Sequence, residues 1–251
     1  MWLVLCETHD AAAAWAHSSL RARGLAPLEI LSAEQLALSE FQEHRLEAAR
    51  TTLRFRTEGG LQVDGQRLRG VVNRLWTVPT GHWRQASQAD QGYVQQELFA
   101  FFLSWLHALP CPVLNRPTPQ GLCGQWRQES EWAWLARQAG LPVAPYRQTS
   151  RDSVDESRGE RRLVPAGAPV QTAIVVGGRV VGAAVPPEIA AGCVRLAKLA
   201  RTALLGVDLI GSAGAGWRFA GASPTPDLRL GGEPLVDALM HELRHLERAA
   251  A

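Results

Sequence analysis

Residues 1–31, MWLVLCETHDAAAAWAHSSLRARGLAPLEIL, decide the fold class. The apolar run 2–6 predicts a buried strand, and the alanine-rich stretch 11–23 has helical spacing and ends at Gly24. Residues 28–31 then predict a second strand. The chain is therefore predicted to be an α/β protein that opens with a β-α-β unit.

The rest of the chain continues to alternate between strand and helix patterns. Strands are expected at residues 51–56, 61–63, 69–75, 112–114, 170–176, 179–185, 205–210 and 217–220. Helices are expected at residues 36–50, 90–109, 129–139, 187–204 and 234–248. The glycine pairs Gly59-Gly60 and Gly177-Gly178 separate neighbouring strands and predict two hairpins.

A charged, serine-rich stretch at residues 150–161, SRDSVDESRGER, has no apolar periodicity and predicts a linker or loop. We therefore expect an N-terminal α/β domain at 1–110 and a connecting strand–helix segment at 111–149. A charged linker at 150–168 and a C-terminal domain at 169–251 complete the predicted organisation.

The composition is that of an ordinary globular protein. Hydrophobic residues make up 46% of the 251 residues and charged residues 20%, which excludes the disordered and fibrous classes. The formal net charge is +2, and the basic residues are scattered. A charge this small and dispersed indicates neither a nucleic-acid partner nor an anionic membrane partner.

The cysteines and the N-terminal residues indicate a cytoplasmic protein. The four cysteines are widely spaced and form no C-x-x-C pair, so we expect reduced, mostly buried thiols. The apolar run at the start is followed at once by polar residues, and it is too short for a signal-peptide core or a membrane span.

Four segments, in their order along the chain, carry a resemblance to a known family. They are VNRL at 72–75, VLNRP at 113–117, LARQAGLPV at 135–143 and the block 205–233, which begins LGVDLI. The chain resembles the ATP-grasp superfamily, in particular the branch that ligates amino acids or modifies ribosomal peptides. The resemblance covers most of residues 70–145 and 170–240, and it implies a pre-ATP-grasp-like N-terminal domain followed by a truncated ATP-grasp-like C-terminal domain.

The resemblance also shows which chemical groups this chain lacks. ATP-grasp enzymes activate a carboxylate as an acyl phosphate and surround the triphosphate with lysines and magnesium. The resemblance implies that Asp208 keeps the first acidic metal ligand. On the next strand, the family's glutamate and asparagine are replaced by Gly221 and Ser223. Alternation along a strand places both of these positions on one face, so both ligands are lost from the same wall of the site.

The central part of the family's nucleotide site is shortened as well. The segment between Tyr146 and Val170 is too short for the α+β unit that carries the family's strand lysine and glycine-rich loop. The only lysine of the chain is Lys198, at a position where the family has no motif. Arginine does not replace lysine interchangeably at a phosphate, because its planar fork differs from a point ammonium charge.

The resemblance places five residues around the former substrate and ATP side. Arg74, Asn115, Arg116 and Arg229 are the candidate cofactor-binding residues, and Asp208 is the candidate metal ligand. No catalytic residue is expected.

These observations predict a pseudoenzyme of a biosynthetic or peptide-modifying pathway, without a cofactor. It would bind a small metabolite, a peptide substrate or another protein of the pathway, such as a catalytic enzyme. The alternative is a minimal ATP-dependent carboxylate–amine ligase with ATP and Mg²⁺, using arginines, Asp208 and Asp227 or Glu233.

Three other motifs leave alternatives open. His241-Glu242-Leu243-Arg244-His245 matches the zinc motif H-E-x-x-H, a third hypothesis of a zinc hydrolase, although a solvated helix face explains it as well. The glycine-rich run 211–216 is interpreted as a turn between strands, not a phosphate loop. Trp126, Trp132 and Trp134 lie either in the core or at an interface with a protein partner.

Overall fold

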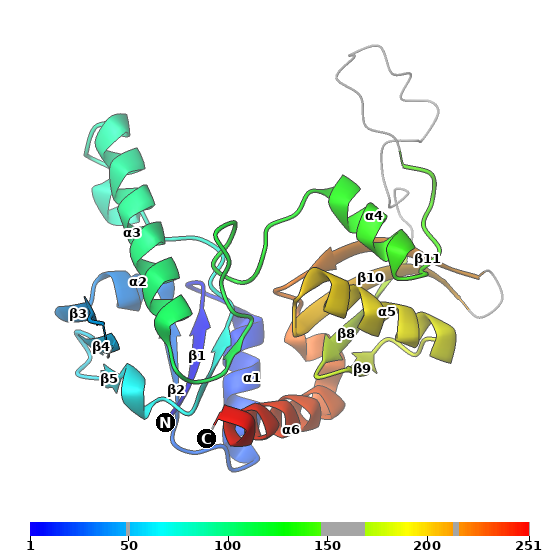
Figure 1. Ribbon diagram of the computed structural model, residues 1–251, viewed down its shortest axis with the longest axis horizontal. Coiled ribbons are helices and arrows are strands. Elements are labelled where there is room, and N and C mark those ends of the chain that lie inside the picture. Colours follow the sequence, from blue (N-terminus) through cyan, green and yellow to red (C-terminus); the bar gives the residue numbers. More distant parts are fainter. Residues whose placement is uncertain (49–50, 147–168, 213–215, 251) are drawn as a thin grey trace. The chain divides into compact units, whose positions relative to one another are not determined.

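The structure is a computed structural model of the chain and describes residues 1–48, 51–146, 169–212 and 216–250. These residues form two compact units (Figure 1). The first unit comprises Met1–Gln125 and Leu239–Ala251, and the second comprises Trp126–Ala238. The predicted linker at 150–161 lies outside the described residues.

A parallel sheet forms the centre of the first unit, with the strand order β2-β1-β6-β7. Its strands are β1 (Trp2–Cys6), β2 (Leu28–Ser32), β6 (Gly70–Asn73) and β7 (Val113–Leu114). β1 is buried along its whole length, as expected for a strand with parallel neighbours on both sides. The predicted β-α-β opening is confirmed, because α1 (Ala11–Ala22) connects β1 to β2.

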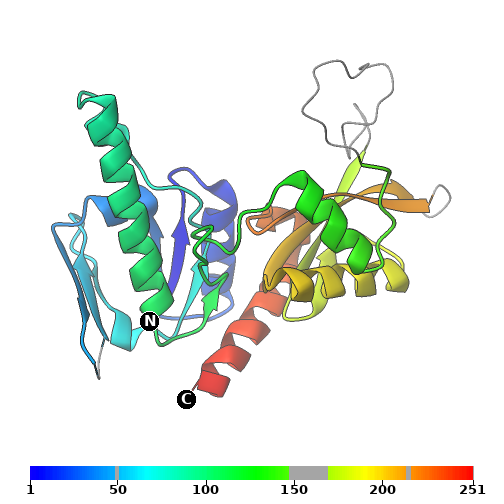
Figure 2. The ribbon, with the colours of Figure 1, turned by 45° about the horizontal axis from the view of Figure 1, so that its top comes forward.

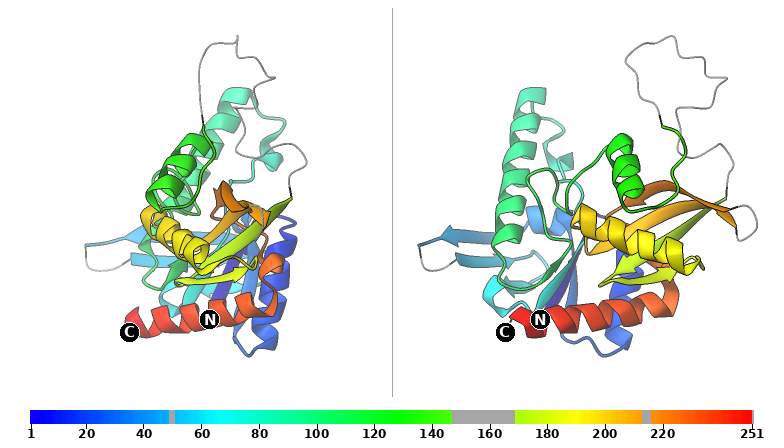
Figure 3. Two further views of the ribbon diagram at one scale, coloured as in Figure 1. Left: turned by 90° about the vertical axis from the view of Figure 1, so that its right-hand side faces the viewer. Right: turned by 45° about the vertical axis from the view of Figure 1, so that its right-hand side comes forward.

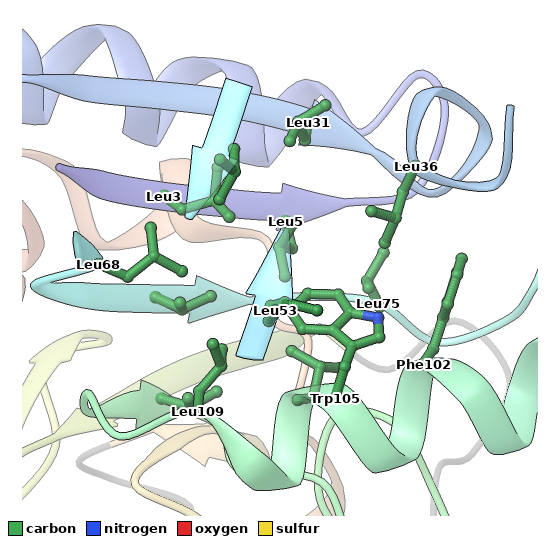
Figure 4. Close-up of a cluster of buried hydrophobic side chains, with 14 of the residues drawn as sticks. Leu3, Leu5, Leu31, Leu36, Leu53, Leu68, Leu75, Phe102, Trp105 and Leu109 are labelled. Atoms are coloured by element: carbon green, nitrogen blue, oxygen red, sulfur yellow. The ribbon is translucent and has the colours of Figure 1, made fainter. Parts of the chain in front are cut away.

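Helix α3 (Gln88–Ala108) packs against the core of the first unit. This helix, drawn in green and cyan in Figure 2, is the longest helix among the described residues. Figure 4 shows Trp105 of α3 beside Leu53 and Leu75, within a core that also includes Leu3 and Leu5 of β1. Two short 3-10 helices, η1 (Gly65–Arg67) and η2 (Gly81–Trp83), lie in the connections.

The predicted helix at residues 36–50 is wrong. The chain forms a short helix α2 (Ala33–Ala37), which begins at a capping box made by Ser32 and Gln35, and then the strand β3 (Phe41–Leu46). β3 pairs antiparallel with β4 (Thr51–Arg56), which pairs with β5 (Gln62–Asp64). Backbone pairing with β4 therefore outweighs the helical propensity of this stretch, a non-local effect that propensity cannot predict.

The second unit is an antiparallel sheet with the order β11-β10-β8-β9. Its strands are β8 (Val170–Val176), β9 (Arg179–Gly182), β10 (Leu204–Ser212) and β11 (Gly216–Ser223). The helices α4 (Glu129–Gln138) and α5 (Pro187–Ala200) lie on the same side of this sheet (Figure 3). Their apolar residues pack on Val207 and Leu209, so Asp208 lies on the opposite face of β10.

The last two helices complete the described chain. η4 (Leu228–Gly231) follows β11, and α6 (Gly232–Ala250) begins in the second unit and ends in the first. β7 and the residues up to Gln125 belong to the first unit, whereas the sequence placed the first boundary at residue 110. Whether residues 1–110 fold as an independent domain stays a prediction.

Two further expectations concern the chain as a whole. All four cysteines are free and buried, as predicted. Among the residues that the structure describes, no helix has the length and hydrophobicity that crossing a membrane requires.

Candidate functional site

The carboxyl edge of the parallel sheet is the first place to look for a ligand site. The chain continues from β1 to β2 on one side, while β6 lies on the other side of β1, so the strand order reverses at β1. Ligands of open α/β sheets bind at the carboxyl ends of the strands beside such a reversal. The residues that follow β1 and β6 here are Glu7 to Asp10 and Arg74.

Arg74 is held there by a buried ion pair with Asp10. Its Nε donates to Asp10 Oδ2 at 2.7 Å and its Nη2 donates to Asp10 Oδ1 at 3.3 Å. The side chains are 5% and 13% exposed. Asp10 also accepts a hydrogen bond from the backbone N–H of Ala13 at 2.9 Å and thereby caps α1. The charge of Arg74 is therefore balanced within the protein.

Asn115 is buried in the same unit and takes part in a network with Asn73. The Asn73 amide donates to the backbone carbonyls of Asn115 at 2.9 Å and Leu122 at 2.7 Å. The thiol of Cys123 donates to the Asn73 carbonyl at 3.0 Å. Burial raises the pKa of the Cys123 thiol to about 11, so this thiol is neutral at ordinary pH. The network ties β6 to β7 and the loop beyond it.

Arg116 is turned toward the end of a helix. Its Nη1 donates to the carbonyls of His107 and Leu109 at 3.2 and 3.4 Å, and its Nη2 donates to the carbonyl of Cys111 at 2.9 Å. A cation at the carboxyl end of a helix satisfies carbonyls that have no partner within the helix and complements the helix dipole. These contacts give Arg116 a structural role at the end of α3.

Glu7 is a residue of this edge that the sequence analysis missed. Its carboxylate accepts hydrogen bonds from the backbone N–H groups of Trp76 and Thr77 and from the Thr77 hydroxyl, which lies 3.0 Å away. The run Glu7-Thr8-His9-Asp10 directly after a buried strand is the signal that could have identified both carboxylates.

Asp208 lies in the second unit, in a row of three residues that cross the sheet. It is aligned with Thr172 of β8 on one side and with Gly221 of β11 on the other. The Thr172 hydroxyl donates to Asp208 Oδ1 at 2.7 Å. Ser223 lies two residues beyond Gly221, and its hydroxyl makes a local contact by accepting a hydrogen bond from the backbone N–H of Thr225 at 3.1 Å.

This row supplies one carboxylate, that of Asp208, toward a metal ion. Mg²⁺ requires octahedral oxygen coordination, supplied by carboxylates, phosphates and water. A Cβ atom built on Gly221 would lie 3.7 Å from Asp208 Oδ2, which is ordinary van der Waals contact. A side chain at position 221 would thus lie beside Asp208, but glycine supplies no oxygen there.

Arg229 is paired with a neighbour in the chain. Its Nη2 lies 2.6 Å from Asp227 Oδ2 and its Nε lies 2.8 Å from Asp227 Oδ1. The Arg229 side chain is 53% exposed. Asp208 and Arg229 are in the second unit, whereas Arg74, Asn115 and Arg116 are in the first. All four candidate cofactor-binding residues, which are Arg74, Asn115, Arg116 and Arg229, have a hydrogen-bond partner within the protein.

The remaining motifs of the sequence separate into core and surface residues. His241 and His245 are exposed, with ring centroids 6.3 Å apart, while Leu239 and Leu243 are buried, as the solvated-face interpretation of α6 predicts. Lys198 is exposed on α5. The tryptophans divide: Trp132 is buried in the core, whereas Trp126 and Trp134 are 51% and 62% exposed.

Comparison with known proteins gives matches among solved structures alone. No protein-family model matches the chain, and no curated protein sequence matches it. The macrocyclase MdnC of Microcystis aeruginosa, bound with precursor peptide MdnA, is 11% identical with a TM-score of 0.72 and covers 97% of this chain and 99% of its own. The macrocyclase MdnB of Microcystis aeruginosa is 15% identical with a TM-score of 0.69, covering 96% and 98%.

A third structure carries the family's name. It is a RiPP-associated ATP-grasp ligase of Chryseobacterium gregarium in complex with ADP and a leader and core peptide. It is 14% identical with a TM-score of 0.66 and covers 99% of this chain and 95% of its own. At these identities the likeness concerns the fold, and it confirms both the predicted α/β class and the resemblance. The chain therefore has an ATP-grasp-like fold.

Proposed function

We propose that the chain is a non-catalytic ATP-grasp-like protein that binds a peptide or a partner protein in a peptide-modifying biosynthetic pathway. It would work in the cytoplasm, without ATP or magnesium as a cofactor. The observation that supports this proposal most is the row formed by Thr172, Asp208 and Gly221.

Phosphoryl transfer from ATP requires positive charge around the phosphates, because negative charge develops there in the transition state. The carboxylate of Asp208 is satisfied by a neutral hydroxyl at 2.7 Å, and the strand beside it presents Gly221. One carboxylate without a second carboxylate beside it is a weak magnesium site. This donor set supports binding or scaffolding in preference to nucleotide chemistry.

The solved structures support a peptide as the partner. MdnC is bound to a precursor peptide, and the Chryseobacterium ligase is in complex with a leader and core peptide. In the chain itself, two large aromatic side chains, Trp126 and Trp134, are exposed on or just before α4. Exposed tryptophans are frequent anchors at protein interfaces, so these two are the candidate contacts for such a partner.

A gain-of-function variant tests the central claim. The double variant Gly221→Glu, Ser223→Asn restores the two oxygen ligands that the resemblance places on β11, and position 221 has room for a side chain. In the natural chain, we expect calorimetry to show no magnesium-dependent binding of ADP. In the double variant, we expect the affinity for Mg²⁺ to be at least about tenfold higher than in the natural chain. Leu199→Glu is the matched control, because it adds a carboxylate on α5, on the other side of the sheet.

Tight magnesium-dependent ADP binding by the natural chain would overturn this proposal. It would instead support the minimal ATP-dependent carboxylate–amine ligase, which the retained Asp208 and the ADP in the Chryseobacterium structure favour. Release of phosphate from ATP on addition of a peptide would then be the defining measurement.

A further inference from the structure

The first unit contains a cavity of about 760 Å³ at the edge of the sheet opposite to Arg74. Met1, Pro27 and Arg69 precede the strands β1, β2 and β6, so the cavity lies at the amino ends of the parallel strands. The β3-β4-β5 sheet forms the remaining wall. Its lining includes Phe41, Arg54, Phe55, Val63, Arg67 and Arg69.

The charge of this cavity is predominantly positive. Four arginines line it, at positions 54, 56, 67 and 69, against one carboxylate, that of Asp64. Arg56 pairs with Glu40 at 3.0 Å. Arg69 forms a two-pronged pair with Glu247, and its guanidinium lies 5.0 Å from the centre of the Trp2 ring. These two arginines are already held by carboxylates.

The other two arginines are held less tightly. Arg54 Nε forms an ion pair with Asp64 Oδ2 at 3.8 Å, which is longer than a hydrogen bond, so an anionic ligand would compete with Asp64 for this guanidinium. The guanidinium of Arg67 has no carboxylate partner among the residues that the structure describes. A planar guanidinium binds phosphate or carboxylate oxygens with two parallel hydrogen bonds, so this pair provides an anion-binding wall.

The cavity also has an apolar wall. Phe55 and Val63 are buried there, and Phe41 is 47% exposed although it is a large aromatic residue. Its ring therefore offers apolar surface beside the arginines. A volume of about 760 Å³ lies within the range of small-molecule sites, which combine apolar walls with a few polar groups.

We propose that this cavity binds a small organic anion in which a phosphate or carboxylate is attached to an aromatic or aliphatic body. Arg54 and Arg67 bind the anionic group, and Phe41 contacts the body of the ligand. The site is independent of the proposed loss of nucleotide chemistry, because neither Arg74 nor any residue of the row Thr172, Asp208 and Gly221 lines the cavity.

Phenyl phosphate is the probe that tests this site, with ¹H–¹⁵N NMR titration as the readout. We expect a dissociation constant on the order of 1 mM or tighter. Arg67→Gln and Arg54→Gln should each weaken binding by about fivefold or more, and Arg67→Lys by less, because the charge remains. Arg45→Gln is the matched control, since Arg45 lies on β3 of the same sheet, is 63% exposed and does not line the cavity.

Two further comparisons test the two walls separately. Phe41→Ser should weaken phenyl phosphate but leave the affinity for inorganic phosphate unchanged, whereas benzyl alcohol, which has no charge, should bind the natural chain far more weakly. The proposal is overturned if benzyl alcohol binds as well as phenyl phosphate or if Arg67→Gln binds as well as the natural chain. Absence of phenyl phosphate binding up to about 10 mM would overturn it too. The circular dichroism of each variant shows whether it is folded.

Discussion

Two sites that the resemblance places near ATP differ in how their charges are satisfied. At the carboxyl edge of the first unit's sheet, Arg74 is 5% exposed and is held by Asp10, which in turn caps α1. In the second unit, Asp208 is half-buried, and its carboxylate accepts a hydrogen bond from the neutral hydroxyl of Thr172. The first arrangement pairs a carboxylate with a guanidinium, whereas the second pairs a carboxylate with a neutral hydroxyl.

The difference shows that a residue can match a family motif for reasons of folding alone. An unpaired charge in the interior is very unfavourable, so Arg74 and Asp10 require each other whether or not a ligand ever binds. Asp208 lies near the surface and is not required in the same way. Its environment, not its resemblance to a metal ligand, decides what it contributes.

Removal of Arg74 should destabilise the protein more than any other change at these two sites. Arg74→Met leaves the carboxylate of Asp10 buried and unpaired, and we expect the free energy of unfolding to fall by about 3–5 kcal/mol. Urea denaturation measures this loss. Adding Asp10→Asn, which keeps a helix-capping side chain, should recover part of it. Arg45→Met, at a 63% exposed site, should change the stability by less than about 0.5 kcal/mol.

The Cys123 thiol belongs to the buried network of the first unit and should make the stability of that unit depend on pH. Burial raises its pKa from 9.0 to about 11, so the folded protein retains a proton that the unfolded chain releases. Its contribution is therefore complete below pH 9 and is lost as the pH rises toward 11. The free energy of unfolding, measured at a series of pH values, should fall between pH 9 and pH 11 in the natural chain. In Cys123→Ala this fall should be smaller by about 2 kcal/mol. An identical pH dependence in both proteins would contradict the assignment.

At Asp208 the expected effects are smaller. Thr172→Val removes the hydroxyl that donates to its carboxylate, and we expect a loss of about 1 kcal/mol, because water can partly replace the hydroxyl at this half-buried site. Thr172→Ser keeps the donor and should retain most of the stability. A loss as large as that of Arg74→Met would show that the Asp208 site is as closed as the first. Thermal unfolding at neutral pH distinguishes these outcomes.

The smallest effect is expected at Arg229. Its pair with Asp227 is exposed and lies within one turn of the chain, so Arg229→Gln should cost about 0.5 kcal/mol or less. The difference should shrink further in high salt, because exposed charges are screened. A loss that is larger and independent of salt would indicate that this guanidinium has a further structural role.

Much of the architecture could be predicted from local patterns. The opening β-α-β unit, the hairpin of β8 and β9 and the long helices α3 and α6 agree with their predicted ranges within a few residues. The stretch at 36–50 could not be predicted in this way, because β3 exists through its pairing with β4. For the candidate site, the residue types were predicted, but the partners of Arg116 and Arg229 were not, since a sequence pattern does not show which carbonyl or carboxylate lies opposite.

The α/β class, the order of most elements and the lack of a carboxylate or amide side chain at positions 221 and 223 could be read from the sequence alone. Those properties follow from residue identity and from periodicities of two and 3.6 residues, which are local. Only the tertiary structure decided that Arg74 meets Asp10 across 64 positions, and that four arginines surround one cavity. Contacts of this kind depend on how strands pair, and pairing is settled by burial and hydrogen bonding over the whole unit.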